Sequence, residues 1–193
     1  WSSDVCSSDL SVLGGLDCSQ PVNIRLPDQE IQRLAPNIQA SCHLHRAFDY
    51  KLETDSYGRR VVPGAPSEAP VLLFLGCSYT TGVGVEGNEA FVSIAQRLLG
   101  SKVRVVNAGM PGIGPNTVLR QLERSDRYLG GLPARIPVGV YTFFPDHIAR
   151  VAGLGSWSID DAASIVPDYR LEGAQLRYRG SIGARLVPRF LAR

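Results

Sequence analysis

Residues 71–82 read VLLFLGCSYTTG, and this stretch decides the fold. Its first five residues are all apolar, which is typical of a strand buried on both faces of a parallel sheet. Two further strands are predicted at residues 103–107 and 138–144, which are rich in valine and aromatic residues. Helices are expected between the strands. The sequence therefore predicts an α/β fold in which right-handed crossovers build a parallel sheet.

Two helices are predicted between these strands. The first spans residues 88–99, and its apolar residues recur at spacings of three and four, which predicts one inward face. That face consists of Phe91, Ile94, Ala95, Leu98 and Leu99. The second helix begins at Pro115, a residue favoured in the first turn, and runs to about residue 129. Its predicted inward residues are Val118, Leu119 and Leu122.

The composition supports a globular protein and excludes some functions. Hydrophobic residues make up 44% of the 193 residues, which is enough for a core. The net charge is only +2 and no run of basic residues occurs, so we expect no nucleic-acid partner. No apolar stretch reaches the roughly 18 residues of a membrane helix, so we expect no membrane span. Compartment and oligomeric state are left open.

The carboxyl ends of the predicted strands are where chemistry is expected, because ligands of open parallel sheets bind there. Ser78 directly follows the first strand, at a turn whose N–H groups favour negative charge. It is either a nucleophile or only a helix cap. The glycines of residues 107–114 allow close backbone approach to a ligand and supply N–H donors for an oxyanion. The alternative is a plain loop. Residues 145–147 follow the third strand.

The stretch of residues 74–124 resembles the SGNH, or GDSL-type, hydrolases, a superfamily of serine esterases. Residues 76–82 are similar to the first block of the family, Gly-Asp-Ser-x-Thr-x-Gly, with Cys77 in place of Asp. Residues 105–112 are similar to the second block. Two further segments look like a bacterial subgroup, and they are Tyr57-Gly58-Arg59-Arg60 and Asp146-His147-Ile148-Ala149-Arg150.

The resemblance implies a fold and a set of site residues. The fold is a three-layer α/β/α arrangement with a flavodoxin-like parallel sheet. Ser78 would be the nucleophile, and the N–H groups of Ser78 and Gly112 would hold the oxyanion. Asn107 and His147 are candidate substrate contacts, and His147 is alternatively a structural hydrogen-bonding residue. The third block of the family supplies an Asn, and Asp146 stands nearest to that place. An ionised carboxylate cannot donate, so Asp146 replaces that donor only when protonated.

The family's last block, Asp-x-x-His, is absent from the chain, and no histidine follows His147. A serine nucleophile needs such a base. We therefore expect a piece truncated at both ends, whose fold is incomplete at the C-terminus and whose own turnover is low. The expected organisation is a non-native leader at residues 1–10, a turn-rich flank at residues 11–70 and an SGNH-like domain at residues 71–193.

The cysteines and a second glycine pattern are candidates for other chemistry. Cys18 and Cys42 form a disulfide in an exported protein or stay free thiols in a reducing compartment. The Cys-His-Leu-His run at residues 42–45 lacks the ligands of a closed zinc site, so no metal is expected. Residues 82–87 match Gly-x-Gly-x-x-Gly, but Gly82 comes six residues after the strand end, so no dinucleotide or other cofactor is expected.

The expected function is hydrolysis of an ester by a serine nucleophile, with an O-acetyl group on a carbohydrate as the substrate class that the family resemblance implies. The alternative is a non-catalytic binding module on the same fold, because the third-block Asn is missing. Fold alone does not decide between them.

Overall fold

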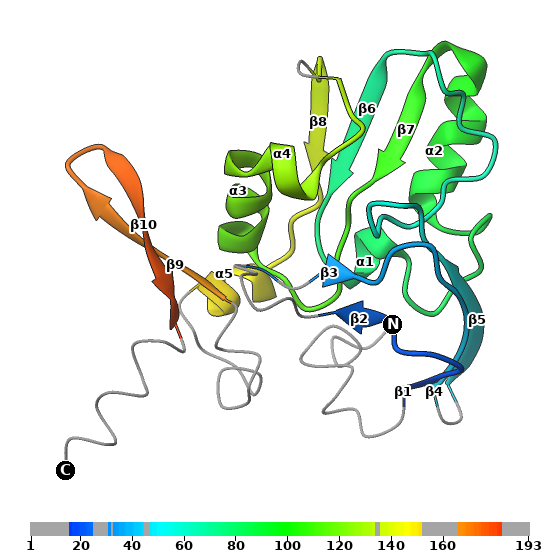
Figure 1. Cartoon of the computed structure of the whole chain (residues 1–193), viewed down its shortest axis with the longest axis horizontal. Helices are drawn as coiled ribbons and strands as arrows, with labels where there is room; N and C mark the ends of the chain where they lie inside the picture. The colour runs from blue at the N-terminus through cyan, green and yellow to red at the C-terminus, as the bar shows by residue number, and fades with distance from the viewer. Residues whose placement is uncertain are drawn as a thin grey trace.

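A computed structural model gives the fold, and it centres on a three-stranded parallel sheet (Figure 1). The sheet order is β7-β6-β8, with β6 (Val71–Leu75) between β7 (Arg104–Asn107) and β8 (Val138–Tyr141). Both neighbours run parallel to β6. The prediction of an α/β fold with a parallel sheet is therefore confirmed. The structure describes residues 16–24, 31, 33–44, 47–133, 136–151 and 166–182.

Helices pack on both faces of the sheet. On the face that carries Phe74, helix α2 (Phe91–Leu99) buries Val92 in a cluster with the sheet. On the face that carries Leu73, helix α3 (Pro115–Glu123) contributes Val118 to the largest cluster. Short elements complete this part of the chain, and they are α1 (Ser78–Thr81), η2 (Gly100–Lys102), α4 (Ser125–Tyr128) and α5 (Asp146–Val151).

The predicted inward face of α2 is confirmed for Ala95, which packs against this cluster, and for Phe91, whose ring contacts Phe74. It is wrong for the other three residues. Leu98 is 83% exposed and Ile94 is 38% exposed, whereas Gln96 is buried. The reason is a set of hydrogen bonds at the edge of the sheet. The Gln96 side chain donates to the Val103 carbonyl at 3.0 Å and accepts from the Val105 N–H at 2.7 Å. These bonds replace missing edge pairing of β7, so the helix turns its polar side toward the strand. The helix also begins at Phe91, later than predicted.

Strand β8 differs from the prediction in length and burial. It ends at Tyr141 and not at residue 144, and Val138 is 53% exposed. The strand lies at the edge of the sheet. In α3, Leu122 is 46% exposed, which contradicts its predicted inward position. An open apolar groove of about 430 Å³ separates α3 from β8, and Leu122 lines it. The two elements therefore leave apolar side chains uncovered.

The flank contains more regular structure than its sequence predicts. An antiparallel sheet of order β1-β4-β5 forms from β1 (Leu16–Cys18), β4 (Gln39–Leu44) and β5 (Phe48–Glu53). Strands β2 (Asn23–Ile24) and β3 (Arg33–Leu34) form a second pair. The leader expected at residues 1–10 lies outside the described residues.

A disulfide joins Cys18 of β1 to Cys42 of β4, so the free-thiol interpretation is wrong for these two cysteines. The two residues are direct cross-strand partners. Cys42 is buried in the apolar cluster of the flank, together with Tyr50 and Leu52 of β5. The disulfide therefore fixes the first strand onto the hydrophobic core of this sheet.

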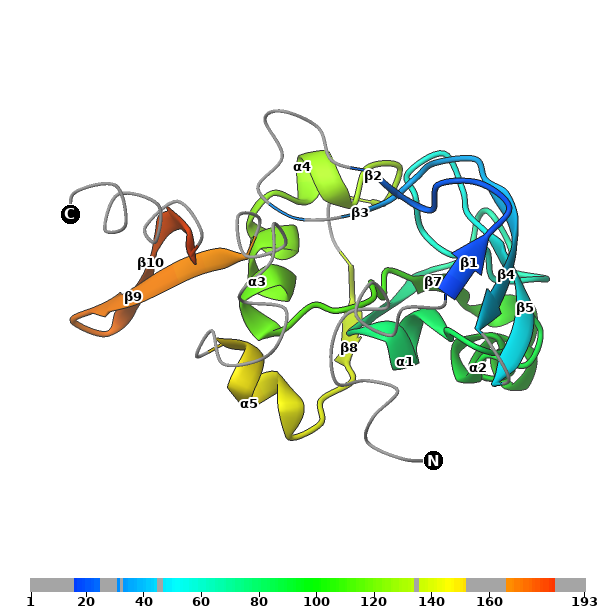
Figure 2. The same cartoon turned by 90° about the horizontal axis from the view of Figure 1, so that it is seen from below.

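The chain after α5 adds a hairpin. Strands β9 (Pro167–Glu172) and β10 (Gln175–Ser181) pair only with each other and extend away from the rest of the molecule (Figure 2). Within the described residues, no helix has both the length and the apolar character needed to cross a bilayer.

Candidate active site at the carboxyl edge of the parallel sheet

The segments that follow the three parallel strands meet at one edge. Ser78 is the first residue of α1, immediately after β6. The Met110 N–H donates to the Gly76 carbonyl at 2.9 Å, which ties the loop after β7 to the turn before Ser78. The Thr142 N–H donates to the Leu75 carbonyl at 2.9 Å, which ties the chain after β8 to the same turn. The predicted clustering of these segments is present in the structure.

Two glycines permit the close packing around α1. A Cβ on Gly76 would lie 2.2 Å from the Thr80 Oγ1 atom, and the backbone there has φ of 152°. A Cβ on Gly109 would lie 2.5 Å from the Thr81 nitrogen and 2.7 Å from the Thr80 carbonyl carbon. Since these contacts involve backbone atoms of α1, only glycine fits at residue 109. The glycine loop is thereby pressed against the helix that begins at Ser78.

Asn107 joins the two segments through its side chain. Its Nδ2 atom donates to the Thr80 carbonyl at 2.7 Å, and its Oδ1 atom accepts from the Gly109 N–H at 3.0 Å. Asn107 is 2% exposed. Its amide is therefore engaged in holding α1 against the loop, and this places Asn107 as a structural support beneath the edge, away from any solvent-side ligand.

Gly112 lies at the exposed top of the loop. Its φ is 77°, a left-handed conformation, and no atom lies within 4 Å of the position a Cβ would take. Two residues later Gly114 caps α3, with the Thr117 and Val118 N–H groups donating to its carbonyl. The space beside Gly112 is open, so a ligand can approach its backbone.

Ser78 is the first residue of the short helix α1, and 8% of its surface is exposed. The preceding Cys77 is the N-terminal cap of α1 and is buried in the main core cluster. Where the resembled family has a polar Asp, this chain packs a thiol into the core. Because a helix begins at Ser78, its backbone N–H has no acceptor within the helix.

Arg60 holds α1 from its other end. The guanidinium donates to the Thr81 carbonyl at 2.9 Å, to the Gly82 carbonyl and to the Val85 carbonyl at 2.7 Å. Arg60 is 3% exposed, and burial lowers its pKa below the ordinary value. The backbone of Arg60 also forms a β-bridge with Asn107. The flank is thus joined to the sheet directly beneath the candidate site.

Arg60 is the site residue whose role the sequence does not reveal. The only signal is its place in the Tyr-Gly-Arg-Arg run of residues 57–60, which the family resemblance singles out without a function. The neighbouring Arg59 has a different role, because it forms an ion pair with Asp55 at 2.7 Å.

His147 is completely buried, at 0% exposure, so it cannot touch a ligand in solvent without a rearrangement. Its Nδ1 atom and the Tyr141 hydroxyl are 2.6 Å apart, and the two rings are stacked. Burial raises the pKa of Tyr141 to about 12, with a further contribution from Cys77. Among the described residues, no partner is found for the His147 Nε2 atom. Asp146 begins α5 and is half-buried.

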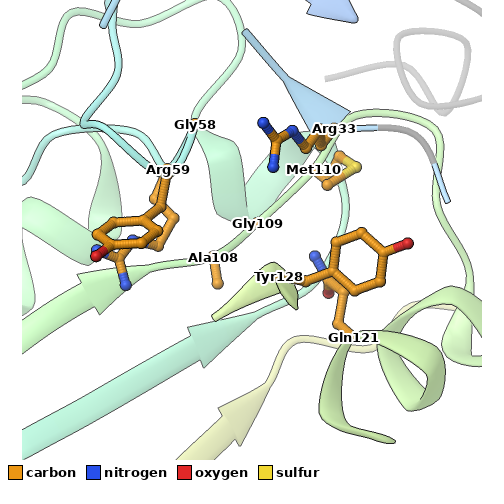
Figure 3. Close-up of a pocket in the computed structure, with 9 residues that line it drawn as sticks. Arg33, Gly58, Arg59, Ala108, Gly109, Met110, Gln121 and Tyr128 are labelled. Carbon is orange, nitrogen blue, oxygen red and sulfur yellow. The ribbon is translucent and has the colours of Figure 1, made fainter. Parts of the chain in front are cut away.

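A small cavity lies behind the glycine loop (Figure 3). Arg33 and Arg59 approach it from the flank, and Gln121 and Tyr128 approach it from α3 and α4. Its volume is about 20 Å³, which is room for about one water molecule and far below the size of a substrate pocket. It therefore belongs to the packing of the flank against residues 108–110.

No group of three or more His, Cys, Asp or Glu side chains in the described part of the chain could hold a metal ion. Comparison with protein-family models, with curated proteins and with solved structures found no match.

Proposed function

We propose that the protein is a serine esterase of the SGNH type, with Ser78 as its nucleophile. The observation that carries the proposal is the packing of the glycine loop against α1. It brings the N-terminus of α1 and the exposed backbone of Gly112 to one edge of the sheet. The sequence resemblance supplies the chemistry, and the three-layer fold of that family belongs to the same proposal.

The reaction proceeds in two steps. The Ser78 Oγ attacks the carbonyl carbon of the ester, and its proton passes to a general base. The backbone N–H groups of Ser78 and Gly112 stabilise the oxyanion, and one such donor typically contributes about 3 kcal/mol. The alcohol then leaves with a proton, and an acyl ester remains on Ser78. Water hydrolyses this ester, releasing the carboxylic acid and restoring the hydroxyl.

The proposed substrate is an O-acetyl ester of a carbohydrate, which rests on the family resemblance. The 193 residues contain no Asp-x-x-His to supply the general base. No Asn is present where the family has its third oxyanion donor. Asp146 begins a helix in that place. The missing Asn favours the second candidate, a binding module for carbohydrate on the same fold.

The decisive experiment compares the protein as its gene encodes it with its Ser78→Ala variant. Hydrolysis of p-nitrophenyl acetate should fall by at least about a thousandfold in the variant, since the nucleophile is lost. A fluorophosphonate probe should label Ser78 alone. Ser101→Ala, which changes an exposed serine, is the matched control. Equal rates for the wild type and Ser78→Ala would rule out the nucleophile.

The binding module gives a different pattern. Acetylated oligosaccharide would then bind in calorimetry without release of acetate, and Ser78→Ala would change neither quantity. Acetate release that depends on Ser78 supports the esterase.

A further inference from the structure

The β9–β10 hairpin is the feature that the candidate site does not use. It projects from the side of the molecule that carries α3, and its end points away from the other described elements (Figures 1 and 2). The strands join through a two-residue turn at Gly173 and Ala174, between the paired residues Glu172 and Gln175. A finger of this shape is convex, so it offers little area to a protein partner.

The base of the hairpin is firmly attached to α3. The Asn116 side chain donates to the Pro167 carbonyl at 2.8 Å, and the Tyr169 hydroxyl donates to Glu123 at 2.5 Å. The Arg120 guanidinium lies 3.8 Å from the centre of the Tyr178 ring. Burial and the bond to Glu123 raise the pKa of Tyr169 above its ordinary value. Since α3 begins directly after Gly114, the direction of the finger is fixed relative to the candidate site.

The two faces of the finger near its end differ sharply. Leu171 and Leu176 are cross-strand partners on one face, and they are 70% and 55% exposed. The neighbouring pair on the other face is Arg170 and Arg177, both exposed. Like charges directly opposite each other are unfavourable in an antiparallel pair. An anion between the two guanidinium groups would offset this repulsion.

The remaining charges of the finger do not neutralise this arginine pair. Glu172 forms an ion pair with Arg179 at 3.3 Å. Asp168 lies near the base of the hairpin and has another interaction. The exposed end therefore combines two aliphatic side chains with two arginines that lack an acidic partner among the described residues.

We propose that the β9–β10 hairpin is a peripheral arm that binds anionic phospholipid bilayers. Leu171 and Leu176 enter the boundary between headgroups and acyl chains, while Arg170 and Arg177 bind lipid phosphates. A single apolar anchor gives only weak membrane binding, and stable binding takes a second, electrostatic signal. The arm supplies both. The two pairs lie on opposite faces, so both reach the bilayer when the end of the hairpin enters it, and the long arginine side chains then extend to the phosphates. This proposal is independent of the reaction at Ser78.

The test is sedimentation of the full protein with phosphatidylcholine vesicles that contain or lack phosphatidylglycerol. Binding should require the anionic lipid and should weaken with salt. The Arg170→Gln/Arg177→Gln variant should lose roughly 25-fold in affinity, about fivefold per arginine. The Leu171→Ser/Leu176→Ser variant should lose at least about tenfold. Leu98→Ser and Arg97→Gln change exposed residues of α2 and should bind as the wild type does.

Several outcomes would contradict the proposal that the hairpin binds anionic bilayers. One is equal binding to neutral and anionic vesicles, and another is unchanged binding by the two hairpin variants. A third is vesicle-independent dimerisation that the leucine variant abolishes, because the partner would then be a second copy of the chain. Circular dichroism checks that each variant is folded. Hydrolysis of soluble p-nitrophenyl acetate should be unchanged in the hairpin variants. The membrane-binding proposal can therefore fail without affecting the esterase proposal at Ser78.

Discussion

The side chain of Asn107 is bonded to the carbonyl of Thr80, 27 residues earlier in the chain, at 2.7 Å. This bond crosses from the end of β7 to the helix that begins at Ser78. The same amide accepts the Gly109 N–H at 3.0 Å. One buried residue thus sets the distance between the two segments that carry the candidate nucleophile and the candidate oxyanion donors.

Replacing Asn107 by Ala should destabilise the protein by about 2–4 kcal/mol, because a buried carbonyl and a buried N–H each lose their partner. The free energy of unfolding in urea measures the effect. Asn88→Ala changes an exposed amide and should stay within about 0.5 kcal/mol of the wild type. A loss in Asn107→Ala no larger than in Asn88→Ala would show that the Thr80 bond contributes nothing.

Replacing Gly109 by Ala should cost about 3 kcal/mol or more, since the new Cβ would meet the backbone of α1 and not a movable side chain. The contact with the Thr81 nitrogen would be 2.5 Å. Gly87→Ala is the matched control, because no atom lies within 4 Å of its Cβ position. Thermal unfolding of the two variants compares them directly. Similar melting temperatures would contradict the close approach of loop and helix.

The sequence predicts the central strand well and the helix beside it poorly, and both results have a physical cause. An unbroken apolar run such as residues 71–75 can be satisfied only inside a sheet, so its bounds match β6. In α2 the apolar periodicity points to Leu98, but the structure buries Gln96. The deciding bonds go to Val103 and Val105, and hydropathy contains no information about them.

The flank and the hairpin also depend on contacts between residues far apart in the chain, which the sequence pattern does not predict. Cys18 pairs with Cys42 across 24 residues, and neither strand has a pattern strong enough to predict that pairing. The hairpin does have a local signal, because Tyr169 and Leu171 mirror Leu176 and Tyr178 about the turn. At the candidate site, sequence identifies the residue types, but only the structure assigns Asn107 to support and His147 to the interior.

Arg60→Lys should destabilise the protein by about 2–4 kcal/mol. A lysine ammonium cannot reproduce the planar fork that donates to the Thr81, Gly82 and Val85 carbonyls, and a buried carbonyl without a donor costs about 1–3 kcal/mol. If Ser78 is the nucleophile, kcat should fall more than KM rises, because α1 is displaced. Arg97→Lys is the exposed control. Unchanged stability and kcat in Arg60→Lys would show that Arg60 does not hold α1 in place.

Reduction of the Cys18–Cys42 disulfide should lower the free energy of unfolding by about 3 kcal/mol, because the unfolded chain regains the entropy that closing a loop of this size removes. The two cysteines are 24 residues apart. Melting temperatures with and without dithiothreitol measure the effect. The Cys18→Ala/Cys42→Ala variant should already be destabilised and should show no further change with reductant. An equal response to reductant in this variant would assign the effect to another cysteine.

Alkaline pH should destabilise the protein through Tyr50. Burial raises the pKa of this tyrosine to about 12 from its ordinary 10.0, while nearby Arg60 partly opposes the shift. Between these two values the unfolded chain loses the phenol proton and the folded chain keeps it. The folded state therefore binds more protons, and stability falls as pH rises from about 10 through about 12. A shift of this size corresponds to roughly 3 kcal/mol.

The Tyr50→Phe variant removes this titration, so its free energy of unfolding should fall less steeply with pH above 10 than that of the wild type. Urea unfolding at a series of alkaline pH values measures the slopes. Tyr57→Phe changes an exposed ring and is the matched control. Because both variants lose one hydroxyl, a flatter slope in Tyr50→Phe alone identifies burial of the phenol beneath Arg60 as the cause. Parallel slopes in all three proteins would contradict it.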